Sequence, residues 1–271
     1  MLKLGKIVAI ASALSFVFTT SVALASTPVS FNVDQANILS GSLGGGDNTA
    51  LAEDWSFEYA YGNIGLNVAS GNTNQQANMA FVDGGSPKFD FDGRVDQDII
   101  GGGSAFSGYN DAHAKDSTFE HAYGNIGANI AAGGQNQQAN NLFALENDTK
   151  VDAHYHQNQA FTLSIDTENN NASVEDDAFN YAHGNIGVNV ASGAMNQQSN
   201  GAVVMTAAPD NDLNHINTSI SQGNFANLNI ASNSDFAAVK DCAFANAYGN
   251  IGVNVASGVG NQQANSLVVE P

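Results

Sequence analysis

Residues 63–78 read NIGLNVASGNTNQQAN, and close copies of this stretch occur three more times in the chain. Together with the thirteen residues before it, the stretch aligns without a gap with three other segments over 29 positions. Fifteen of these positions are identical in all four copies, which span residues 50–78, 112–140, 172–200 and 237–265. Units repeated at this interval are typical of architectures in which each unit buries its faces against its neighbours. The repeats therefore decide the fold.

The pattern inside each copy predicts strands. In residues 63–68 apolar side chains alternate with Asn and Gly, and residues 74–79 place three amides on one face of a second strand. Aromatic residues alternate in the same way over residues 57–61, which predicts a third strand. Tight bends at Gly62 and Gly71 would join the three. A helix is disfavoured because Gly and Asn recur at every turn of any helical register.

One such layer cannot bury its own faces, and stacking the copies about 4.7 Å apart places identical residues above one another. The predicted fold is all-β: a repeat β-solenoid or cross-β stack of four layers. Variable spacers over residues 79–111, 141–171 and 201–236 would join the layers. Two spacer stretches, residues 161–165 and 225–230, also alternate. Each could add a strand to the edge of a layer or could loop out.

Side-chain amides suit such a stack because each carries donors and an acceptor for the same residue in the next layer. The predicted stacking ladder consists of one aromatic column and four amide columns: Phe57, Phe119, Phe179 and Phe244; Asn67, Asn129, Asn189 and Asn254; Asn74, Asn136, Asn196 and Asn261; Gln75, Gln137, Gln197 and Gln262; Gln76, Gln138, Gln198 and Gln263. The turn glycines of the four copies are Gly71, Gly133, Gly193 and Gly258.

One charged column supports stacking in the order of the sequence. The residue before the shared Asp alternates between acid and base, as Glu53, Lys115, Glu175 and Lys240. Neighbouring layers in register would then always have opposite charges, and Lys240 of one molecule would meet Glu53 of the next. The shared Asp column opposes this, because stacked carboxylates repel one another. We therefore expect assembly to quicken with added salt or at lower pH.

The N-terminal residues 1–25 have the pattern of a secretory signal peptide, with two lysines, an apolar run and a small-x-small site that ends at Ala25. Cleavage there would change the net charge from −19 to −21. We expect a secreted chain without a membrane anchor, because no second long apolar run follows. Such a negative chain is not a partner for nucleic acid. Residues 26–49 would form an N-terminal segment and residues 266–271 a short tail.

The run GNIGxN[VI]A[SA]GxxNQQ[AS]N resembles the repeat of the Fap functional-amyloid fibre subunits, the FapC-like major subunit first and the FapB-like minor subunit as the sister possibility. The resemblance implies Greek-key-like layers of a β-solenoid in an extracellular fibre of biofilm matrix. It also implies export through an outer-membrane pore and partnership with a nucleating minor subunit. The chain departs from the major subunit in having four repeats rather than three. It also lacks a C-terminal Cys-x-x-Cys, because its one cysteine is Cys242.

Other constellations are weaker. The acidic stretch of residues 90–98 could bind calcium but lacks the Gly and Glu positions of an EF-hand loop, and a solvated spacer is the simpler interpretation. Asp152, His154 and His156 share one strand face and could hold a metal, although a polar strand face is the simpler interpretation. His183 replaces Tyr in its column. We predict no cofactor and no metal site.

From the sequence we predict that the protein is not an enzyme. Cys242 varies freely within its repeat column, and no motif of a nucleophile, a metalloprotease or a phosphate loop occurs. Two other classes of function remain: a self-assembling subunit of an extracellular fibre, and a soluble monomeric β-solenoid that acts as a surface adhesin or binds calcium or glycans. Soluble solenoids end in atypical polar repeats, whereas copies one and four are as regular as the inner two, which favours the fibre.

Overall fold

The computed structural model describes residues 12–19, 29–38, 41–45, 47–71, 73–82, 90–107, 109–146, 150–166, 169–206, 215–231 and 234–269. These residues form strands, turns and bends without a helix, which confirms the all-β prediction. Accordingly, the described chain has no helix that is long and apolar enough to cross a membrane. The predicted cleavage site at Ala25 lies outside the described residues.

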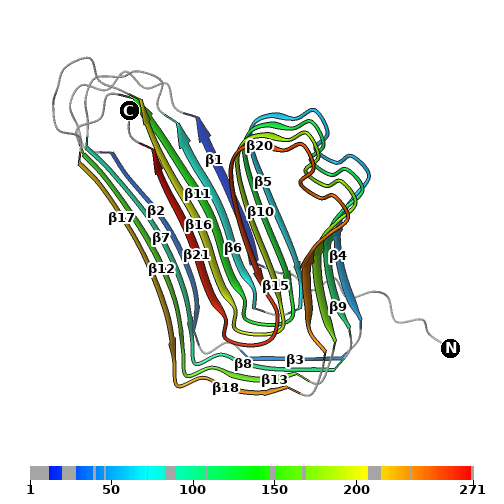
Figure 1. The fold of residues 1–271 in the computed structure, drawn as a ribbon. Helices are drawn as coiled ribbons and strands as arrows, with labels where there is room; N and C mark the ends of the chain where they lie inside the picture. Colours follow the sequence, from blue (N-terminus) through cyan, green and yellow to red (C-terminus); the bar gives the residue numbers. More distant parts are fainter. Residues whose placement is uncertain are drawn as a thin grey trace.

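The strands fall into four layers of five that follow one another along the chain (Figure 1). Layer one contains β2 (Val29–Ile38), β3 (Gly41–Gly45), β4 (Asn48–Ala52), β5 (Tyr61–Ser70) and β6 (Gln75–Val82). Layer two contains β7 (Asp90–Ile100), β8 (Gly103–Ser107), β9 (Asn110–Ala114), β10 (Tyr123–Ala132) and β11 (Gln137–Glu146). Layer three contains β12 (Lys150–Ala160), β13 (Leu163–Asp166), β14 (Asn170–Val174), β15 (His183–Ser192) and β16 (Gln197–Thr206). Layer four contains β17 (His215–Phe225), β18 (Leu228–Ala231), β19 (Phe236–Val239), β20 (Tyr248–Ala256) and β21 (Gln262–Val269).

Each strand pairs in parallel with the corresponding strands of the layers above and below it. The sheets run β2-β7-β12-β17, β3-β8-β13-β18, β4-β9-β14-β19, β5-β10-β15-β20 and β6-β11-β16-β21. Identical residues of the repeats are paired, for example Asn67 with Asn129 and Asn129 with Asn189. The chain therefore stacks its copies in register and in sequence order.

Within a layer the chain curls inward, as Figure 1 shows: β2, β3 and β4 form an outer course, and β5 and β6 return inside it. One apolar core fills the space between the β4 and β5 sheets and includes Phe119, Ile130 and Val174. A second lies between the β6 and β2 sheets and includes Phe91 and Phe143. The two cores leave the facing surfaces of the β5 and β6 sheets to amide side chains.

The spacers do not merely connect the repeats. They form the strands of the outer course. The stretch at residues 161–165 contributes β13 after a bend at Phe161, and the one at residues 225–230 contributes β18 after a bend at Ala226. The acidic stretch at residues 90–98 lies in β7, whose side chains alternate between exposed or half-buried and buried positions. The layer is thus almost twice as long as the repeat.

The prediction of a strand over residues 57–61 is wrong. Residues 54–59 form a turn in which Asp54, Trp55 and Tyr59 have positive φ angles near 55°. Two strands of the repeat, β5 and β6, join at Gly71, and Gly62 lies near the start of β5 rather than at a bend between strands. The three alternating aromatics still form columns, because each ring stacks on the ring at the same position of the next layer.

One further strand lies outside the four layers. β1 (Ser12–Thr19) pairs in parallel with the open edge of β6, with Ser12 opposite Gln75 and Thr19 opposite Val82. It belongs to the segment that we predict to be removed as a signal peptide. In this structure it occupies the position that a preceding layer would take on that sheet.

Candidate functional site: the amide seam and the two end layers

The surfaces of β5 and β6 that face each other form a seam of asparagine side chains that runs through all four layers. Asn78 Nδ2 donates to Asn67 Oδ1 in its own layer at 2.8 Å and to the Leu66 carbonyl at 3.1 Å. Asn129 of the next layer donates to Asn67 Oδ1 and to Asn78 Oδ1, both at 3.0 Å. Buried amides are costly unless they are satisfied, and this cross-linked pattern satisfies them both within and between layers.

The same contacts recur up the stack. Asn189 donates to Asn129 and Asn254 donates to Asn189, at 2.9 and 3.0 Å. The column of Asn78 continues through Asn140, Asn200 and Asn265, each linked to the one below at 3.0 Å.

The two glutamine columns of β6 point to opposite sides. Gln76 Nε2 donates to the Val68 carbonyl of β5 at 3.1 Å, whereas Gln75 Nε2 donates to the Asp98 carbonyl of β7 at 3.0 Å. Each column is also continuous between layers, with amide-to-amide bonds of 2.7 to 2.9 Å for Gln76, Gln138, Gln198 and Gln263. The bonds are 2.8 to 2.9 Å for Gln75, Gln137, Gln197 and Gln262.

The Asn74 column holds the turn between β5 and β6. Asn74 Oδ1 accepts from the backbone N–H of Asn136 at 2.9 Å, and Asn74 Nδ2 donates to the Gly133 carbonyl at 2.9 Å. Asn136 and Asn196 repeat the backbone contact toward Asn196 and Asn261. These side chains therefore bind each turn to the turn of the following layer.

The phenylalanine column is stacked at the corner between the β4 and β5 sheets. Ring centroids are 5.0 Å apart for Phe57 and Phe119, 4.6 Å for Phe119 and Phe179, and 4.8 Å for Phe179 and Phe244, with interplanar angles of 15° or less. Phe119 and Phe179, in the inner layers, are fully buried.

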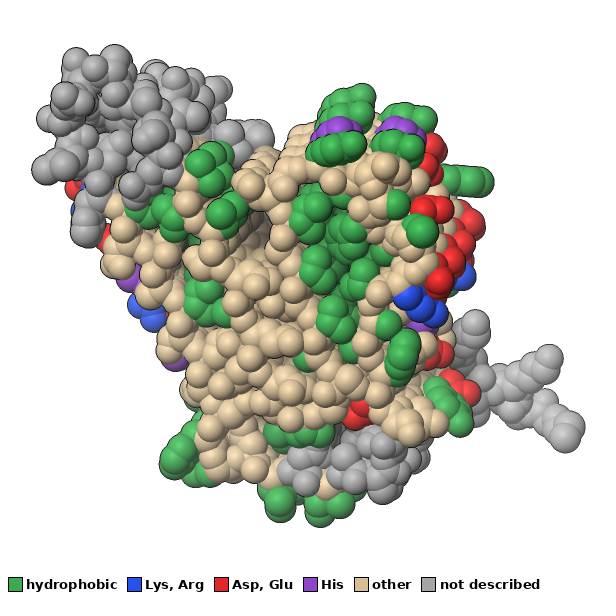
Figure 2. Space-filling model, viewed as in Figure 1, with side chains coloured by type: hydrophobic (Ala, Val, Ile, Leu, Met, Phe, Trp, Pro, Cys, Tyr) green, Lys and Arg blue, Asp and Glu red, His purple; other side chains and the backbone are tan. Residues whose placement is uncertain are grey.

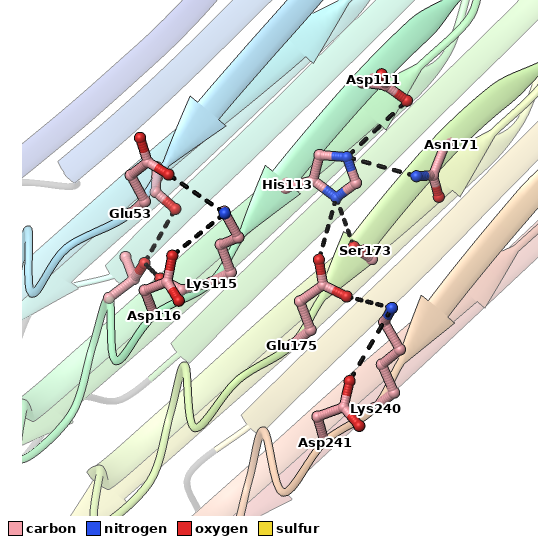
Figure 3. Close-up of polar contacts among 12 residues, drawn as sticks. Glu53, Asp111, His113, Lys115, Asp116, Asn171, Ser173, Glu175, Lys240 and Asp241 are labelled. Carbon is pink, nitrogen blue, oxygen red and sulfur yellow. Dashed lines mark hydrogen bonds and ion pairs between the residues drawn. The ribbon is translucent and has the colours of Figure 1, made fainter.

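The charged column is brought together only in part (Figure 3). Lys115 Nζ lies 3.4 Å from Glu53 Oε2, and Lys240 Nζ contacts Glu175 Oε2. Among the described residues, no ion pair joins Lys115 to Glu175. Instead His113 Nδ1 lies 3.6 Å from Glu175 Oε1.

The two lysines also relieve the aspartate column that follows the charged one. Lys115 Nζ lies 3.3 Å from Asp116 Oδ2, and Lys240 Nζ lies 4.0 Å from Asp241 Oδ2. Hydrogen bonds to Asp116 and then Glu53 raise the pKa of Lys115, and a hydrogen bond to Glu175 raises the pKa of Lys240. Both side chains are partly exposed, which limits what such pairs contribute to stability.

An amide column that was not predicted from the sequence runs through the N-terminal segment and the spacers. Gln97 Nε2 donates to Gln35 Oε1 at 2.7 Å, and Gln157 donates to Gln97 and Gln222 to Gln157 at 2.8 Å. Gln97 also donates to the Gln138 carbonyl of β11 at 3.2 Å, which joins the outer course to the inner one. The signal was present, since these glutamines are spaced by the same 62, 60 and 65 residues as the repeats.

The other sequence-based candidates lie on the surface. Asp152, His154 and His156 share the half-buried face of β12, but Asp152 contacts Lys150 at 2.6 Å and His154 contacts Ser219 at 2.6 Å. The hydrogen bond from Lys150 lowers the pKa of Asp152. Cys242 is an exposed free thiol.

His183 stacks between Tyr123 and Tyr248, with ring centroids 4.8 and 5.0 Å apart. It replaces a tyrosine within a continuous aromatic column.

The two end layers leave matching groups open. Gln76 Oε1 in layer one is buried and has no hydrogen-bond partner, although Gln138 Oε1, Gln198 Oε1 and Gln263 Oε1 each accept from the layer before. Tyr61 and Tyr248, at the two ends of their column, are 74% and 59% exposed. Within the described residues, β1 covers only the β6 edge of layer one, and no other strand covers layer four.

Comparison with known proteins agrees with this architecture. The functional amyloid protein FapB/FapC family matches residues 8–98 and 92–271. The functional amyloid subunit FapC of Pseudomonas aeruginosa is 27% identical over 259 residues, which cover 79% of this chain and 74% of that protein. No solved structure matches the chain.

Proposed function

Since this chain belongs to the FapB/FapC family of functional amyloid proteins, we propose that it is a secreted subunit that polymerises head to tail into an extracellular fibre. In this fibre, layer four of one molecule lies against layer one of the next. The five sheets then continue without interruption from molecule to molecule.

The observation that carries the proposal is the open acceptor in layer one. In the Gln76 column each amide donates to the following layer, so Gln76 Oε1 is the acceptor without a donor and Gln263 is the last amide of the series. A preceding molecule stacked in register brings its own Gln263 to Gln76. In the chain that retains β1, this acceptor is buried beside β1 without a partner. Once residues 1–25 are removed, the Gln263 amide of a preceding molecule can take the place of β1 and donate to it.

Residue types at the junction match as well as those between layers inside the chain. Phe244 meets Phe57, Asn254 meets Asn67, and Lys240 meets Glu53 of the next molecule. Opposite charges at the junction favour head-to-tail contact over contact between two first layers or two fourth layers.

The N-terminal strand supports a link between export and assembly. β1 pairs with the same eight residues of β6, Gln75–Val82, that β21 of a preceding molecule would pair with in register. Removal of residues 1–25 as a signal peptide frees this edge. The fibre would then grow outside the cell, after passage through an outer-membrane pore and with a minor subunit that nucleates it, as a component of biofilm matrix and of adhesion.

Fibre diffraction tests the proposal directly. The chain without residues 1–25 is expected to form fibres with reflections near 4.7 and 10 Å, and the chain that retains them is expected to elongate more slowly. A truncated chain that stays monomeric at high concentration for days would contradict the proposal. That outcome would favour the soluble β-solenoid that binds calcium, a glycan or a surface.

A further inference from the structure

Two carboxylates are stacked at the turn between β4 and β5 without a neighbouring cation. Glu58 of layer one and Glu120 of layer two occupy the same position of the repeat. Within the described residues, no Lys or Arg forms an ion pair with either side chain. The aspartate column four positions earlier differs, because Lys115 and Lys240 lie beside it. The carboxylates of Glu58 and Glu120 repel one another at this close approach, and a bound cation would relieve the repulsion.

An imidazole completes the group. The ring of His121 is held between those of Tyr59 and Tyr181, with both centroid distances at 5.0 Å. Its Nδ1 is buried without a hydrogen-bond partner and lies 3.7 Å from Glu120 Oε1. The stack therefore fixes the ring in a plane that aims an unsatisfied nitrogen at the two carboxylates. Figure 2 shows histidine side chains held between hydrophobic ones at one corner of the molecule, with acidic side chains beside them.

We propose that Glu58, Glu120 and His121 bind one divalent transition-metal ion of the Zn²⁺ class. One ligand atom from each residue lies within 4.8 Å of the others. Ligand atoms around a tetrahedral zinc ion are about 3.4 Å apart, and rotation of the half-exposed glutamates closes the difference. Two carboxylates and one imidazole suit such an ion, with water in the remaining position.

The site is restricted to one pair of layers. The position of Glu120 is Asn180 in layer three and Ala245 in layer four, and that of His121 is Tyr181 and Asn246. The ion would therefore join layers one and two of each chain. It would recur once per molecule along a fibre.

Zinc titration of the metal-free full chain, by calorimetry, tests the site. The variant His121→Tyr restores the residue found in layers one and three, so the aromatic column and the turn are kept while the nitrogen ligand is lost. The control His183→Tyr makes the same exchange in the neighbouring column. We expect one Zn²⁺ per chain for the wild type and for His183→Tyr, and at least tenfold weaker binding for His121→Tyr and for Glu58→Gln.

A second readout separates coordination from loose attraction to the acidic surface. Co²⁺ bound by the wild type and by His183→Tyr should give visible absorption bands that His121→Tyr lacks. Zinc binding of equal strength in His121→Tyr, or no binding by the wild type, would overturn the proposal. Fibre growth in EDTA measures assembly separately, because the ion is not needed for the stacking of the layers.

Discussion

At the scale of single residues, buried side-chain amides help to hold the protein together. Their burial is tolerated because hydrogen bonds within and between layers satisfy their donors and acceptors. Gln138 donates to the Ile130 carbonyl at 2.9 Å and to Gln198 Oε1 at 2.8 Å, and it accepts from Gln76 at 2.7 Å. An apolar residue of the same size would fill the space but leave these groups without partners. The amide columns are therefore as much a part of the core as the phenylalanines.

The variant Gln138→Leu tests how much these hydrogen bonds contribute to the free energy of unfolding. We expect the free energy of unfolding to fall by about 2–3 kcal/mol or more, because each buried polar group that loses its partner costs about 1–3 kcal/mol. Gln263→Leu is the matched control, since the same column residue in layer four is only half-buried and water can replace its contacts. Denaturant unfolding of the monomers should show the larger loss for Gln138→Leu, and equal losses would contradict this explanation.

At the scale of elements, the turns decide how closely two layers approach. Gly133 has a φ of +97°, and a Cβ atom added to it would lie 2.1 Å from the carbonyl oxygen of Gly193. The turn glycines are thus needed for two reasons, the left-handed backbone conformation and the contact with the next turn.

Gly133→Ala should therefore unfold the inner layers or separate them. The backbone conformation alone costs about 1–3 kcal/mol for a residue other than glycine, and the contact with a rigid carbonyl adds to this. Gly103→Ala in β8 is the control, because its φ is not positive and its Cβ would meet nothing within 4 Å. Circular dichroism on heating should show a large fall in the unfolding temperature for Gly133→Ala alone.

At the scale of the whole molecule, each end layer lacks a neighbouring layer on one side, where only β6 of layer one is paired, with β1. A Cβ atom added to Gly193 would lie 2.2 Å from the Gly258 carbonyl, whereas one added to Gly258 would meet nothing within 4 Å. In a head-to-tail fibre the neighbour of Gly258 is Gly71 of the next molecule. A substitution at Gly258 can therefore act on the junction and spare the interior.

Gly258→Ala is expected to leave the monomer folded and to stop elongation. The added methyl group would point at the Gly71 carbonyl of the incoming molecule, as its counterparts do inside the chain. Gly260→Ala carries the same left-handed strain, with a φ of +69°, but its column holds Thr73, Gln135 and Met195, so a side chain is accepted there. Seeded growth, followed by light scattering, should fail for Gly258→Ala and continue for Gly260→Ala. Normal growth of both would exclude the in-register junction.

The charged column should influence which chains can elongate a given fibre seed. A chain in which Glu53, Lys115, Glu175 and Lys240 are all inverted keeps its internal alternation, but it meets a wild-type molecule with like charges at the junction. We expect each chain to elongate its own seeds at a normal rate and the seeds of the other chain more slowly. The effect should be about fivefold at most, because an exposed pair contributes about 0.2–1 kcal/mol. Equal rates for both kinds of seed would show that the column does not select the register.

The net charge of the chain should make the rate of fibre elongation depend on salt concentration and pH. A chain of charge near −21 repels its own kind, so elongation should quicken with salt and on lowering the pH from 7 towards 4. The pKa values of Lys115 and Lys240 are raised in the folded chain, so both lysines stay protonated throughout this range. Their contribution to stability is lost only as the pH rises past about 10. Lag times that do not change with salt or acid would contradict the role of charge.

The sequence alone was sufficient for the stack itself. Four copies with fifteen identical positions leave little choice other than in-register layers, because amides and aromatics gain most when they meet their own kind. The columns of Asn67, Gln75, Gln76 and Phe57 could be predicted for the same reason. When the same residue occurs at the same position of every repeat, its contact partner in the stack is its counterpart in the next layer.

The tertiary structure decided what does not repeat. The N-terminal segment forms β2, and spacers of unlike sequence form β7, β12 and β17. Strand pairing uses backbone groups that every sequence has, and only the Gln97 column marks these strands in the sequence. The turn at residues 54–59, the position of His113 beside Glu175 and the meeting of Glu58, Glu120 and His121 depend on local backbone angles and on neighbours about 60 residues away. The alternation of apolar and polar residues along the chain predicts neither the backbone angles nor these distant neighbours.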